Sequence, residues 1–370
     1  MRIVYLLTSL GIGGAERQAL ALAERMAARG HAAALLVLRG RQSEQWPTSL
    51  DPVHFNMRRT PASLLAGLWK ARRFLRDFQP DLIHSHTYPA NMMARMLKIL
   101  HPATTVLSTV HNVYEGRWPR MFAYRLTDLL SHHTIAVSQA AADRYVRLKA
   151  VPARKLSVVA NGIDIAELAP SPDRRISLRA QMGVQDEFVW LAAGRIAPAK
   201  DYPNLLSALA RVHAAVPNAS LWIAGEAVSA SFEVTKALAA DLGASVRWLG
   251  LRRDIPALLD AADGFVLASA WEGMPLAVGE AMAMEKPVVA TDVGGVRELM
   301  GDAGVLVPPR DWDALAAAMV EMMRRSREDR QTLGYAARAR IQARFSMDTR
   351  ADEWDVFYHS VVEPRLADRP

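Results

Sequence analysis

The sequence predicts an α/β protein built from two doubly wound, Rossmann-like domains. Short, almost continuously apolar runs alternate with amphipathic stretches from end to end, as in parallel sheets covered by helices on both faces. The 370 residues exceed one ordinary core and suit two domains. A proline-punctuated stretch at 169–172 interrupts the alternation and is interpreted as a linker. We therefore expect domains at 1–167 and 168–347, with a final helix at about 348–362 packing back on the first.

The individual elements follow from the same alternation. Apolar runs predict strands in the first domain at 3–7, 33–38, 81–84, 105–110, 134–137 and 156–159. Further runs predict strands in the second domain at 188–193, 220–225, 246–250, 264–269, 287–291 and 304–307. Amphipathic stretches predict helices in the first domain at 14–29, 61–78, 88–100 and 118–130. Because ligands of such sheets bind beyond the carboxyl ends of the strands, site residues are sought directly after each run.

Composition excludes several classes of protein. The chain has no cysteine, so disulfides, thiolate metal sites and cysteine nucleophiles are ruled out. No run reaches the roughly 18–20 apolar residues that a membrane-spanning helix needs. The N-terminal run is short and lacks the cleavage site of a signal peptide, so we interpret it as the first buried strand. These features lead us to expect a cytoplasmic protein.

Charge is divided unevenly between the two halves. Residues 1–165 hold 22 Lys and Arg against 10 Asp and Glu, a net +12, whereas residues 166–370 hold 23 against 28, a net −5, which together give +7. Two basic stretches interleaved with aromatics, 68–78 and 117–125, suit an anionic membrane surface. Solvated helices whose aromatics enter the core are the alternative. No nucleic-acid motif is present, so no nucleic-acid partner is expected, and the sequence does not indicate an oligomeric state.

A glycine-rich turn, GIGGAERQ at 11–18, follows the first strand. Gly13 and Gly14 allow a tight turn and close approach by a ligand, and a helix begins immediately afterwards. The turn is not the dinucleotide fingerprint, because Glu16 occupies the third glycine position. An ordinary strand-to-helix turn remains the alternative.

Two cations, Arg195 and Lys200, follow the first strand of the second domain in GRIAPAKDYPN. Arginine offers bidentate contacts and lysine a point charge, so together they can neutralise a diphosphate without a metal ion. Pro203 suits the first turn of the next helix. An exposed basic loop is the alternative interpretation.

The most specific segment is SAWEGMPLAVGEAMAMEKPVVATD, which carries Glu272 and Glu280. Gly273 and Pro275 predict a helix beginning near Pro275, with Glu272 in the loop before it. Free N–H groups of 274–276 at the positive helix end suit phosphate oxygens. We expect Glu272 to reach sugar hydroxyls and Glu280 to accept hydrogen bonds from ribose hydroxyls. Two exposed glutamates near a helix start are the alternative.

Histidines follow two neighbouring strands of the first domain. His111 ends one run in TVHN, and His84 and His86 end another in DLIHSH. Each is a candidate for contact with substrate or a satisfied structural histidine. Asn161-Gly162 is a turn signal at the domain junction and a candidate hinge.

In these motifs the chain resembles the family 4 glycosyltransferases. The resemblance rests on GGAER (13–17), HN (111–112), AVS (136–138), NGID (161–164), GR-x4-K (194–200), WLG (248–250), EGMPLAVGE (272–280) and GG-x-x-E (294–298). It implies the GT-B fold, in which the two domains face each other across a cleft. It also implies retaining, metal-independent hexosyl transfer, without a cofactor, from a UDP- or GDP-linked sugar to a glycan or polyprenyl-linked acceptor in bacterial surface polysaccharide or glycolipid synthesis.

The same resemblance assigns roles to individual residues. It places the donor diphosphate on Arg195 and Lys200, the ribose on Glu280, and the base near Gly250, Leu251 and Arg252. It places the donor sugar and its phosphate on Glu272 and the backbone of Gly273, Met274, Pro275 and Leu276. His111 lies by the reacting sugar, and the acceptor and diphosphate are faced by Gly13, Gly14, Glu16, Arg17 and His86. A sugar-nucleotide epimerase of the same fold and a non-catalytic nucleotide-sugar-binding protein are the rival hypotheses.

Overall fold

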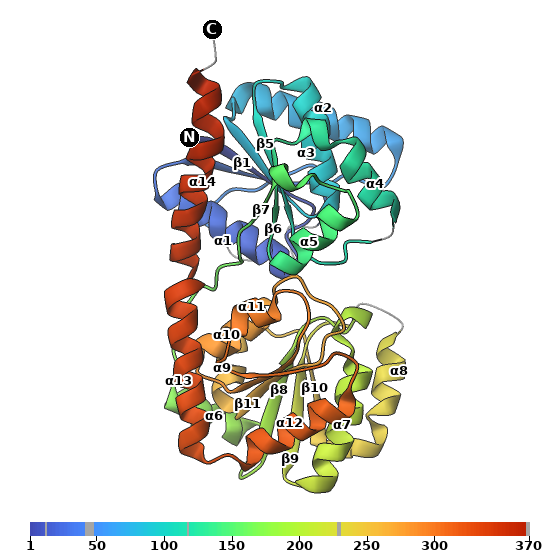
Figure 1. The fold of residues 1–370 in the computed structure, drawn as a ribbon, viewed down its shortest axis with the longest axis vertical. Helices are drawn as coiled ribbons and strands as arrows, with labels where there is room; N and C mark the ends of the chain where they lie inside the picture. The colour runs from blue at the N-terminus through green and yellow to red at the C-terminus, as the bar shows by residue number, and fades with distance from the viewer. Residues whose placement is uncertain (12, 41–47, 117, 228–230, 368–370) are drawn as a thin grey trace. The chain divides into compact units, whose positions relative to one another are not determined.

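The chain folds into two compact units, each built around one parallel sheet with helices on both faces (Figure 1). The computed structural model describes residues 1–11, 13–40, 48–116, 118–227 and 231–367. Unit 1 comprises Met1–Gly162 and Met347–Pro370, and unit 2 comprises Ile163–Ser346. The predicted pair of doubly wound, Rossmann-like domains is therefore confirmed.

Unit 1 contains a seven-stranded sheet in the order β3-β2-β1-β4-β5-β6-β7, paired in parallel throughout. Its strands are β1 (Arg2–Leu7), β2 (Ala32–Val37), β3 (Val53–His54), β4 (Leu82–His86), β5 (Thr105–Val110), β6 (His133–Ala136) and β7 (Leu156–Val158). Its helices are α1 (Gly14–Ala28), α2 (Pro61–Phe78), α3 (Tyr88–Leu100), α4 (Trp118–Leu126), α5 (Gln139–Arg147) and α14 (Met347–Ala367), with 3₁₀ turns η2 (Asp128–Leu130) and η3 (Ala153–Lys155). The two-residue edge strand β3 was not predicted, and the expected helix at 118–130 is interrupted at Thr127.

The core of unit 1 shows why the strand runs are almost continuously apolar. Along β1, Ile3 and Tyr5 join the cluster that contains α1 and α14, whereas Val4 and Leu6 join the cluster of α2 and α3. Successive side chains of a strand point to opposite faces, so a sheet covered on both sides needs apolar residues at every position. Each fully buried side chain of this kind contributes about 1.5–3 kcal/mol.

The C-terminal helix α14 belongs to the core of unit 1. Its buried positions recur at helical spacing, as Met347, Ala351, Trp354, Tyr358 and Val362. The Tyr358 hydroxyl lies 3.2 Å from the Tyr5 hydroxyl and 2.7 Å from His84 Nδ1, so the polar tip of this buried ring is satisfied. The last helix therefore completes the layer that covers one face of the first sheet.

Unit 2 contains a six-stranded parallel sheet in the order β10-β9-β8-β11-β12-β13. Its strands are β8 (Phe188–Ala193), β9 (Ala219–Ala224), β10 (Val246–Gly250), β11 (Gly264–Leu267), β12 (Val288–Thr291) and β13 (Val305–Val307). Its helices are α6 (Pro172–Gln181), α7 (Tyr202–Ala215), α8 (Ser231–Leu238), α9 (Ile255–Ala261), α10 (Leu276–Ala283), α11 (Val296–Met300), α12 (Trp312–Arg324) and α13 (Arg327–Arg344), with 3₁₀ turns η4 (Pro198–Lys200) and η5 (Ala240–Ser245). Helices α7 and α12 bury their apolar sides against one face of this sheet.

The predicted boundary at 167 falls inside unit 2. Ile163 already packs there, because its N–H donates to the Phe345 carbonyl at 2.7 Å and its side chain lies against Gly279. The stretch 169–172 is not a linker between the units. Ser171 is the N-cap of α6, with Pro172 at the first helical position, and the Ser171 N–H donates to Asp260 at 2.9 Å. The proline signal therefore marked a helix start rather than a domain boundary.

Among the residues that the structure describes, no helix combines the length and the apolar character that crossing a lipid bilayer requires.

Candidate functional site

Each sheet has one point where the strand order reverses, between β1 and β4 in unit 1 and between β8 and β11 in unit 2. At such a point the connections leave toward opposite faces of the sheet, which leaves a crevice beyond the carboxyl ends of the two strands. The predicted site residues follow these strands. His86 ends β4, Lys200 follows β8 and Glu272 follows β11.

An ion pair joins the two strand ends in unit 2. Lys200 Nζ lies 2.6 Å from Glu272 Oε1, and the Ser269 hydroxyl donates to the same oxygen at 2.6 Å. The side chains of Lys200 and Glu272 are 20% and 11% exposed, so the pair is largely shielded from water. Both bonds go to Oε1, and within the described parts of the chain none goes to Oε2. The glutamate can therefore accept a hydrogen bond from a ligand while holding the lysine.

The loop that carries Arg195 and Lys200 is held by backbone contacts. The Tyr202 hydroxyl donates to the Gly194 carbonyl at 2.9 Å, and the Ala270 N–H donates to the Ala199 carbonyl at 2.9 Å. The second bond ties the loop after β8 to the loop after β11. Arg195 itself is exposed at the start of this loop. The arrangement fixes Lys200 and leaves the guanidinium accessible to an anion.

A close backbone approach explains the glycine at 225. A Cβ there would lie 1.9 Å from the Gly194 carbonyl oxygen, and Gly194 has a φ of +151°. The strand ends of β8 and β9 are thus close enough to exclude any side chain at 225. This packing sets the path of the chain into the Arg195–Lys200 loop.

Helix α10 begins at Leu276, four residues after Glu272. This start corrects the expectation about which backbone N–H groups are free at the helix end. Pro275 is the N-cap, with φ −76° and ψ 115°, and no side chain caps the helix. Since proline has no N–H, the free first-turn donors belong to 276–278 and not to 274–276. These donors carry the positive end of the helix dipole, which favours a phosphate oxygen.

Other residues that the sequence predicted to contact the donor lie near the same strand ends. Glu280 is buried in the second turn of α10, at 5% exposure, and Met274 is buried at the same level. Gly273 accepts an N–H from Gly295 at 2.6 Å, and a Cβ at Gly294 would lie 2.1 Å from the Glu272 carbonyl oxygen. The loop that carries Glu272 is therefore packed tightly against its neighbour after β12.

The residues expected near the nucleotide base follow β10. Gly250 has a φ of +65° and accepts the N–H of Gly225 at 2.8 Å, and Leu251 is exposed. Arg252 Nε donates to Asp254 at 2.7 Å, so the basic side chain there is neutralised. This edge of the sheet offers an exposed apolar side chain and backbone groups, which suit a flat ring better than a phosphate.

A pair of histidines occupies the corresponding place in unit 1. His86 Nδ1 lies 2.9 Å from His111 Nε2. Burial holds the pKa of His86 well below its usual range, with further lowering from His84 and His111, and burial lowers the pKa of His111 to about 4. Both rings are therefore neutral at pH 7.

Each ring of this pair has a second nitrogen that does not take part in the bond between the two histidines, and this nitrogen can contact a ligand. Among the described residues, His86 Nε2 and His111 Nδ1 are buried without a hydrogen-bond partner. One ring must donate to the other, so the pair presents one N–H and one lone pair to a ligand. His84 differs, because its two nitrogens contact Tyr358 and Thr109, at 2.7 and 2.6 Å. His84 is thus a satisfied structural histidine.

A buried carboxyl group that the sequence did not reveal supports His111. Glu115 Oε1 accepts the backbone N–H of His111 at 3.2 Å, and Oε2 accepts the hydroxyls of Tyr124 and Tyr145 at 3.1 and 3.0 Å. Burial raises the pKa of Glu115, although these donors oppose the shift. The two tyrosines come from α4 and α5, so neither spacing nor a motif could have identified the cluster.

The glycine-rich turn after β1 begins α1 at Gly14, with Gly13 as N-cap in extended conformation. Ile12 lies outside the described residues. A Cβ on Gly13 would lie 2.1 Å from Glu16 Oε2, and Ser9 donates to Glu16 Oε1 at 3.0 Å. The carboxylate of Glu16 therefore already covers this helix start, and Arg17 beside it is half-buried. The negative charge favours hydroxyl groups over phosphate here.

Thr87 is a second residue that the sequence did not reveal. It follows β4 with a φ of 72° and a ψ of 156°, which is unusual for a β-branched residue. Its hydroxyl lies 2.7 Å from that of Thr8, which follows β1. The strained residue thus lies where β1 and β4 separate, at the crevice of unit 1.

Comparison with known families identifies both units. A family described as "Glycosyltransferase Family 4" matches residues 12–167, and one described as "Glycosyl transferases group 1" matches residues 187–325. The chain is 26% identical over 267 residues to an Escherichia coli protein, covering 68% of each chain. That protein is UDP-Gal:alpha-D-GlcNAc-diphosphoundecaprenol alpha-1,3-galactosyltransferase. This chain is also 31% identical over 296 residues to D-inositol 3-phosphate glycosyltransferase of Segniliparus rotundus, and the match covers 74% of this chain and 64% of that protein.

Solved structures share the fold over nearly the full length. The Anabaena protein Alr3699/HepE in complex with UDP superposes with a TM-score of 0.83 and 25% identity, covering 97% of this chain and 100% of that one. Two units of this topology, matched by these two families, define the GT-B class of glycosyltransferases. The chain is a glycosyltransferase of the family 4 type.

Proposed function

We propose that this glycosyltransferase moves a hexose from a UDP- or GDP-linked donor to a glycan or polyprenyl-linked acceptor, with retention of configuration and without a metal ion. The observation that carries the proposal is the shielded Lys200–Glu272 pair where β8 and β11 diverge. It supplies a cation for the diphosphate and a carboxylate for the sugar at one point.

Breakage of the sugar–phosphate bond leaves negative charge on the diphosphate. Preorganised donors aimed at that charge provide the largest part of catalysis in such reactions. The Lys200 ammonium has three donors, of which one is used by Glu272, so the others can take phosphate oxygens. Arg195 and the first-turn N–H groups of α10 complete a cationic and dipolar cradle. This set performs the charge neutralisation for which other enzymes use a divalent ion.

Glu272 positions sugar hydroxyls in this proposal and is not a covalent nucleophile. Its Oε1 already accepts hydrogen bonds from Lys200 and Ser269, so the lone pairs of that oxygen are engaged and less available to attack an anomeric carbon. The acceptor hydroxyl attacks from the side of the departing phosphate, which takes the hydroxyl proton. Retention of configuration follows from that front-face path.

The neutral His86–His111 pair serves the uncharged groups of the reaction. One N–H and one lone pair suit a sugar hydroxyl, which is itself both donor and acceptor. We assign unit 1 to the acceptor, and the E. coli relative, named for a lipid-diphosphate acceptor, supports a polyprenyl-linked glycan in bacterial surface polysaccharide or glycolipid synthesis.

Product analysis tests the proposal. The full chain is incubated with a panel of UDP- and GDP-hexoses and polyprenyl-diphosphate glycans in EDTA, and the new linkage is assigned by NMR. Transfer with the donor's anomeric configuration is expected. An inverted product, or activity that EDTA abolishes and Mg²⁺ restores, contradicts the mechanism. Epimerised donor in reactions without acceptor supports an epimerase, and binding without turnover on every acceptor supports a binding protein.

A further inference from the structure

Four large apolar side chains lie exposed in a row on α4 and the following turn η2. Trp118, Phe122, Leu126 and Leu129 are 76%, 55%, 70% and 90% exposed. The first three are spaced by four residues, which keeps them on one side of the helix. The rings of Trp118 and Phe122 contact each other, with centroids 6.5 Å apart. We call these four residues the α4 stripe.

The opposite side of α4 is already used by the core. Met121 and Tyr124 are buried there, and Tyr124 bonds Asn91 and Glu115. The exposed row is therefore not a displaced core face. Scattered single apolar residues on a surface are ordinary, but a contiguous row of four marks a site of interaction.

Helix α2 provides the contrast within the same unit. Its aromatics Phe74 and Phe78 stack on each other and pack against the core. At these two positions the basic stretch 68–78 is therefore a solvated helix whose aromatics enter the core, which was the alternative to a membrane-binding surface. Leu65 and Trp69, spaced by four residues, are exposed at 64% and 71%. One turn further along that side, Arg72 and Arg73 are charged, so this exposed row has two apolar residues, whereas the α4 stripe has four. Arg117, the first basic residue of the other stretch, lies outside the described residues.

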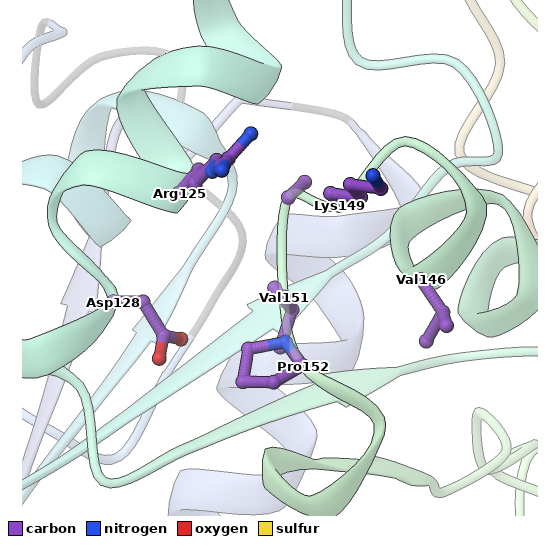
Figure 2. A pocket seen from close by; sticks show the side chains of 7 residues that line it. Arg125, Asp128, Val146, Lys149, Val151 and Pro152 are labelled. Carbon is purple, nitrogen blue, oxygen red and sulfur yellow. The ribbon is translucent and has the colours of Figure 1, made fainter.

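A basic-rimmed pocket of about 360 Å³ adjoins the α4 stripe. Figure 2 shows Arg125 of α4 and Lys149, just after α5, on either side of the hollow, with Val151 and Pro152 between them. The carboxylate of Asp128 also lines it, but that group pairs with Lys155 at 3.1 Å. The rim therefore keeps its positive charge above an apolar floor.

Lys149 occupies a position where glycine is the usual residue. It has a φ of +53° and ends α5, with its N–H on the Val146 carbonyl and the next N–H on the Tyr145 carbonyl. This is the hydrogen-bond pattern of a helix end whose left-handed residue is normally glycine. A lysine there adds a cation to the pocket rim at the expense of backbone strain.

Apolar side chains beside cations match the two layers of an anionic membrane surface. Aromatic and leucine side chains enter the acyl boundary, and arginine and lysine pair with lipid phosphates at headgroup level. Unit 1 carries this surface, and residues 1–165 have a net charge of +12, from 22 basic and 10 acidic residues. The charge is of the sign that the anionic surface attracts.

We propose that the α4 stripe inserts into an anionic lipid bilayer and that Arg125 and Lys149 bind its lipid phosphates at the mouth of the adjoining pocket. This surface belongs to unit 1, whereas the residues assigned to the donor belong to unit 2. Its test therefore needs no donor, acceptor or turnover, and its failure leaves the proposed function untouched.

Flotation with vesicles tests the insertion. The full chain is mixed with vesicles of phosphatidylcholine alone or of phosphatidylcholine with phosphatidylglycerol. Wild type is expected to float with the second kind, and Trp118→Ser and Phe122→Ser each lower the partition coefficient roughly tenfold, the loss expected from one buried aromatic. Trp69→Ser is the matched control, an equally exposed tryptophan of the same unit outside the α4 stripe, and it is expected to bind as wild type.

Two further variants test the pocket rim. Lys149→Gly removes the cation and also relieves the left-handed strain, so it keeps the fold while lowering binding to the anionic vesicles roughly fivefold. Arg125→Gln is expected to act similarly, and both effects shrink as salt is raised. Unchanged binding of Lys149→Gly, with a thermal midpoint at or above that of wild type, overturns the role of the pocket.

Other results of the same experiments would contradict membrane insertion. Equal flotation with uncharged vesicles, no flotation at low salt, or loss of binding in Trp69→Ser instead of Trp118→Ser contradicts the proposal. So does light scattering that shows a dimer in wild type and a monomer in Trp118→Ser, because the α4 stripe then covers a second copy of the chain.

Discussion

The two units place very different chemistry at the same point of the same topology. In unit 2 the strand ends at the reversal of sheet order carry a charged pair, Lys200 and Glu272. In unit 1 the corresponding place holds two neutral histidines, His86 and His111, whose pKa values burial depresses. The fold thus fixes where a ligand binds, and the side chains fix whether that ligand is an anion or an uncharged hydroxyl.

The difference also extends to how each site is supported. Lys200 is held in a largely shielded place by the carboxylate of Glu272, which the Ser269 hydroxyl also contacts. His111 is held through its backbone by the buried carboxyl of Glu115, and burial of the ring lowers its pKa to about 4, so the ring is uncharged at pH 7. Substitutions in the two units should therefore alter different measurable quantities.

The largest effect is expected for Lys200→Ala. Loss of one preorganised donor to the leaving diphosphate should lower kcat/KM roughly 10²–10³-fold and weaken nucleotide binding. Initial rates and a binding titration measure both. Arg211→Ala is the matched control, because Arg211 of the same unit pairs with the exposed Asp313 away from these strand ends. An effect as large in Arg211→Ala would mean that general charge, not the site, is responsible.

The pH dependence of stability should differ between the units. His111 has a folded-state pKa of about 4 against 6.5 for an unperturbed histidine, so below pH 6.5 the unfolded chain binds protons that the folded chain excludes. The free energy of unfolding should be highest above pH 6.5 and fall by about 3 kcal/mol on account of His111 as the pH drops to about 4, and His86 should change it in the same direction.

Denaturant unfolding of wild type and of the double variant His86→Asn/His111→Asn measures this contribution. Glu115, whose pKa burial raises, has the opposite pH dependence, but it is common to both proteins. The difference between the two curves should therefore isolate the histidine pair. Parallel curves would show that these rings titrate normally.

His111→Ala should separate catalysis from donor binding. Removing a group that hydrogen-bonds an uncharged substrate hydroxyl is expected to lower kcat roughly 10–100-fold. The dissociation constant of the nucleoside diphosphate should not change, because that ligand is assigned to unit 2. Rates and a nucleotide titration on the same preparation suffice. Equal loss of nucleotide affinity would erase the distinction between the units.

Glycine substitutions beside the first strand of each sheet give the smallest contrast. In Gly225→Ala the new Cβ meets the backbone carbonyl of Gly194 at 1.9 Å, and this clash should destabilise the fold by about 1–3 kcal/mol. In Gly13→Ala the nearest atom is the mobile carboxylate of Glu16, which can rotate away, so the cost should stay below about 1 kcal/mol. Thermal unfolding compares the two, and the reverse order would contradict the backbone-contact argument.

Most of the fold could be predicted because strands buried on both faces leave an unmistakable apolar run. The missed strand β3 has two residues, too few to show a pattern, and Thr127 breaks a helix whose apolar spacing continues through it. The boundary at 167 was misplaced because Ser171-Pro172 signals a helix start as strongly as a linker.

The candidate site was less predictable than the fold. The sequence placed Lys200 and Glu272 after two strands of the same domain, but it did not predict their ion pair, which depends on β8 and β11 being neighbours. The pairing of His86 with His111 required β4 and β5 to be neighbours, which the sequence does not state. Glu115 could not be found at all, because its partners come from two separate helices and no local pattern marks it.

The central claim is that Lys200 and its neighbours bind a nucleoside diphosphate without a metal ion. Isothermal titration of UDP and GDP into the full chain in the presence of EDTA tests it most directly. We predict saturable binding of one of the two nucleotides in wild type and a loss of at least tenfold in affinity in Lys200→Ala, the counterpart of about 1.4 kcal/mol. Binding that disappears in EDTA, or that is unchanged in Lys200→Ala, would contradict the account.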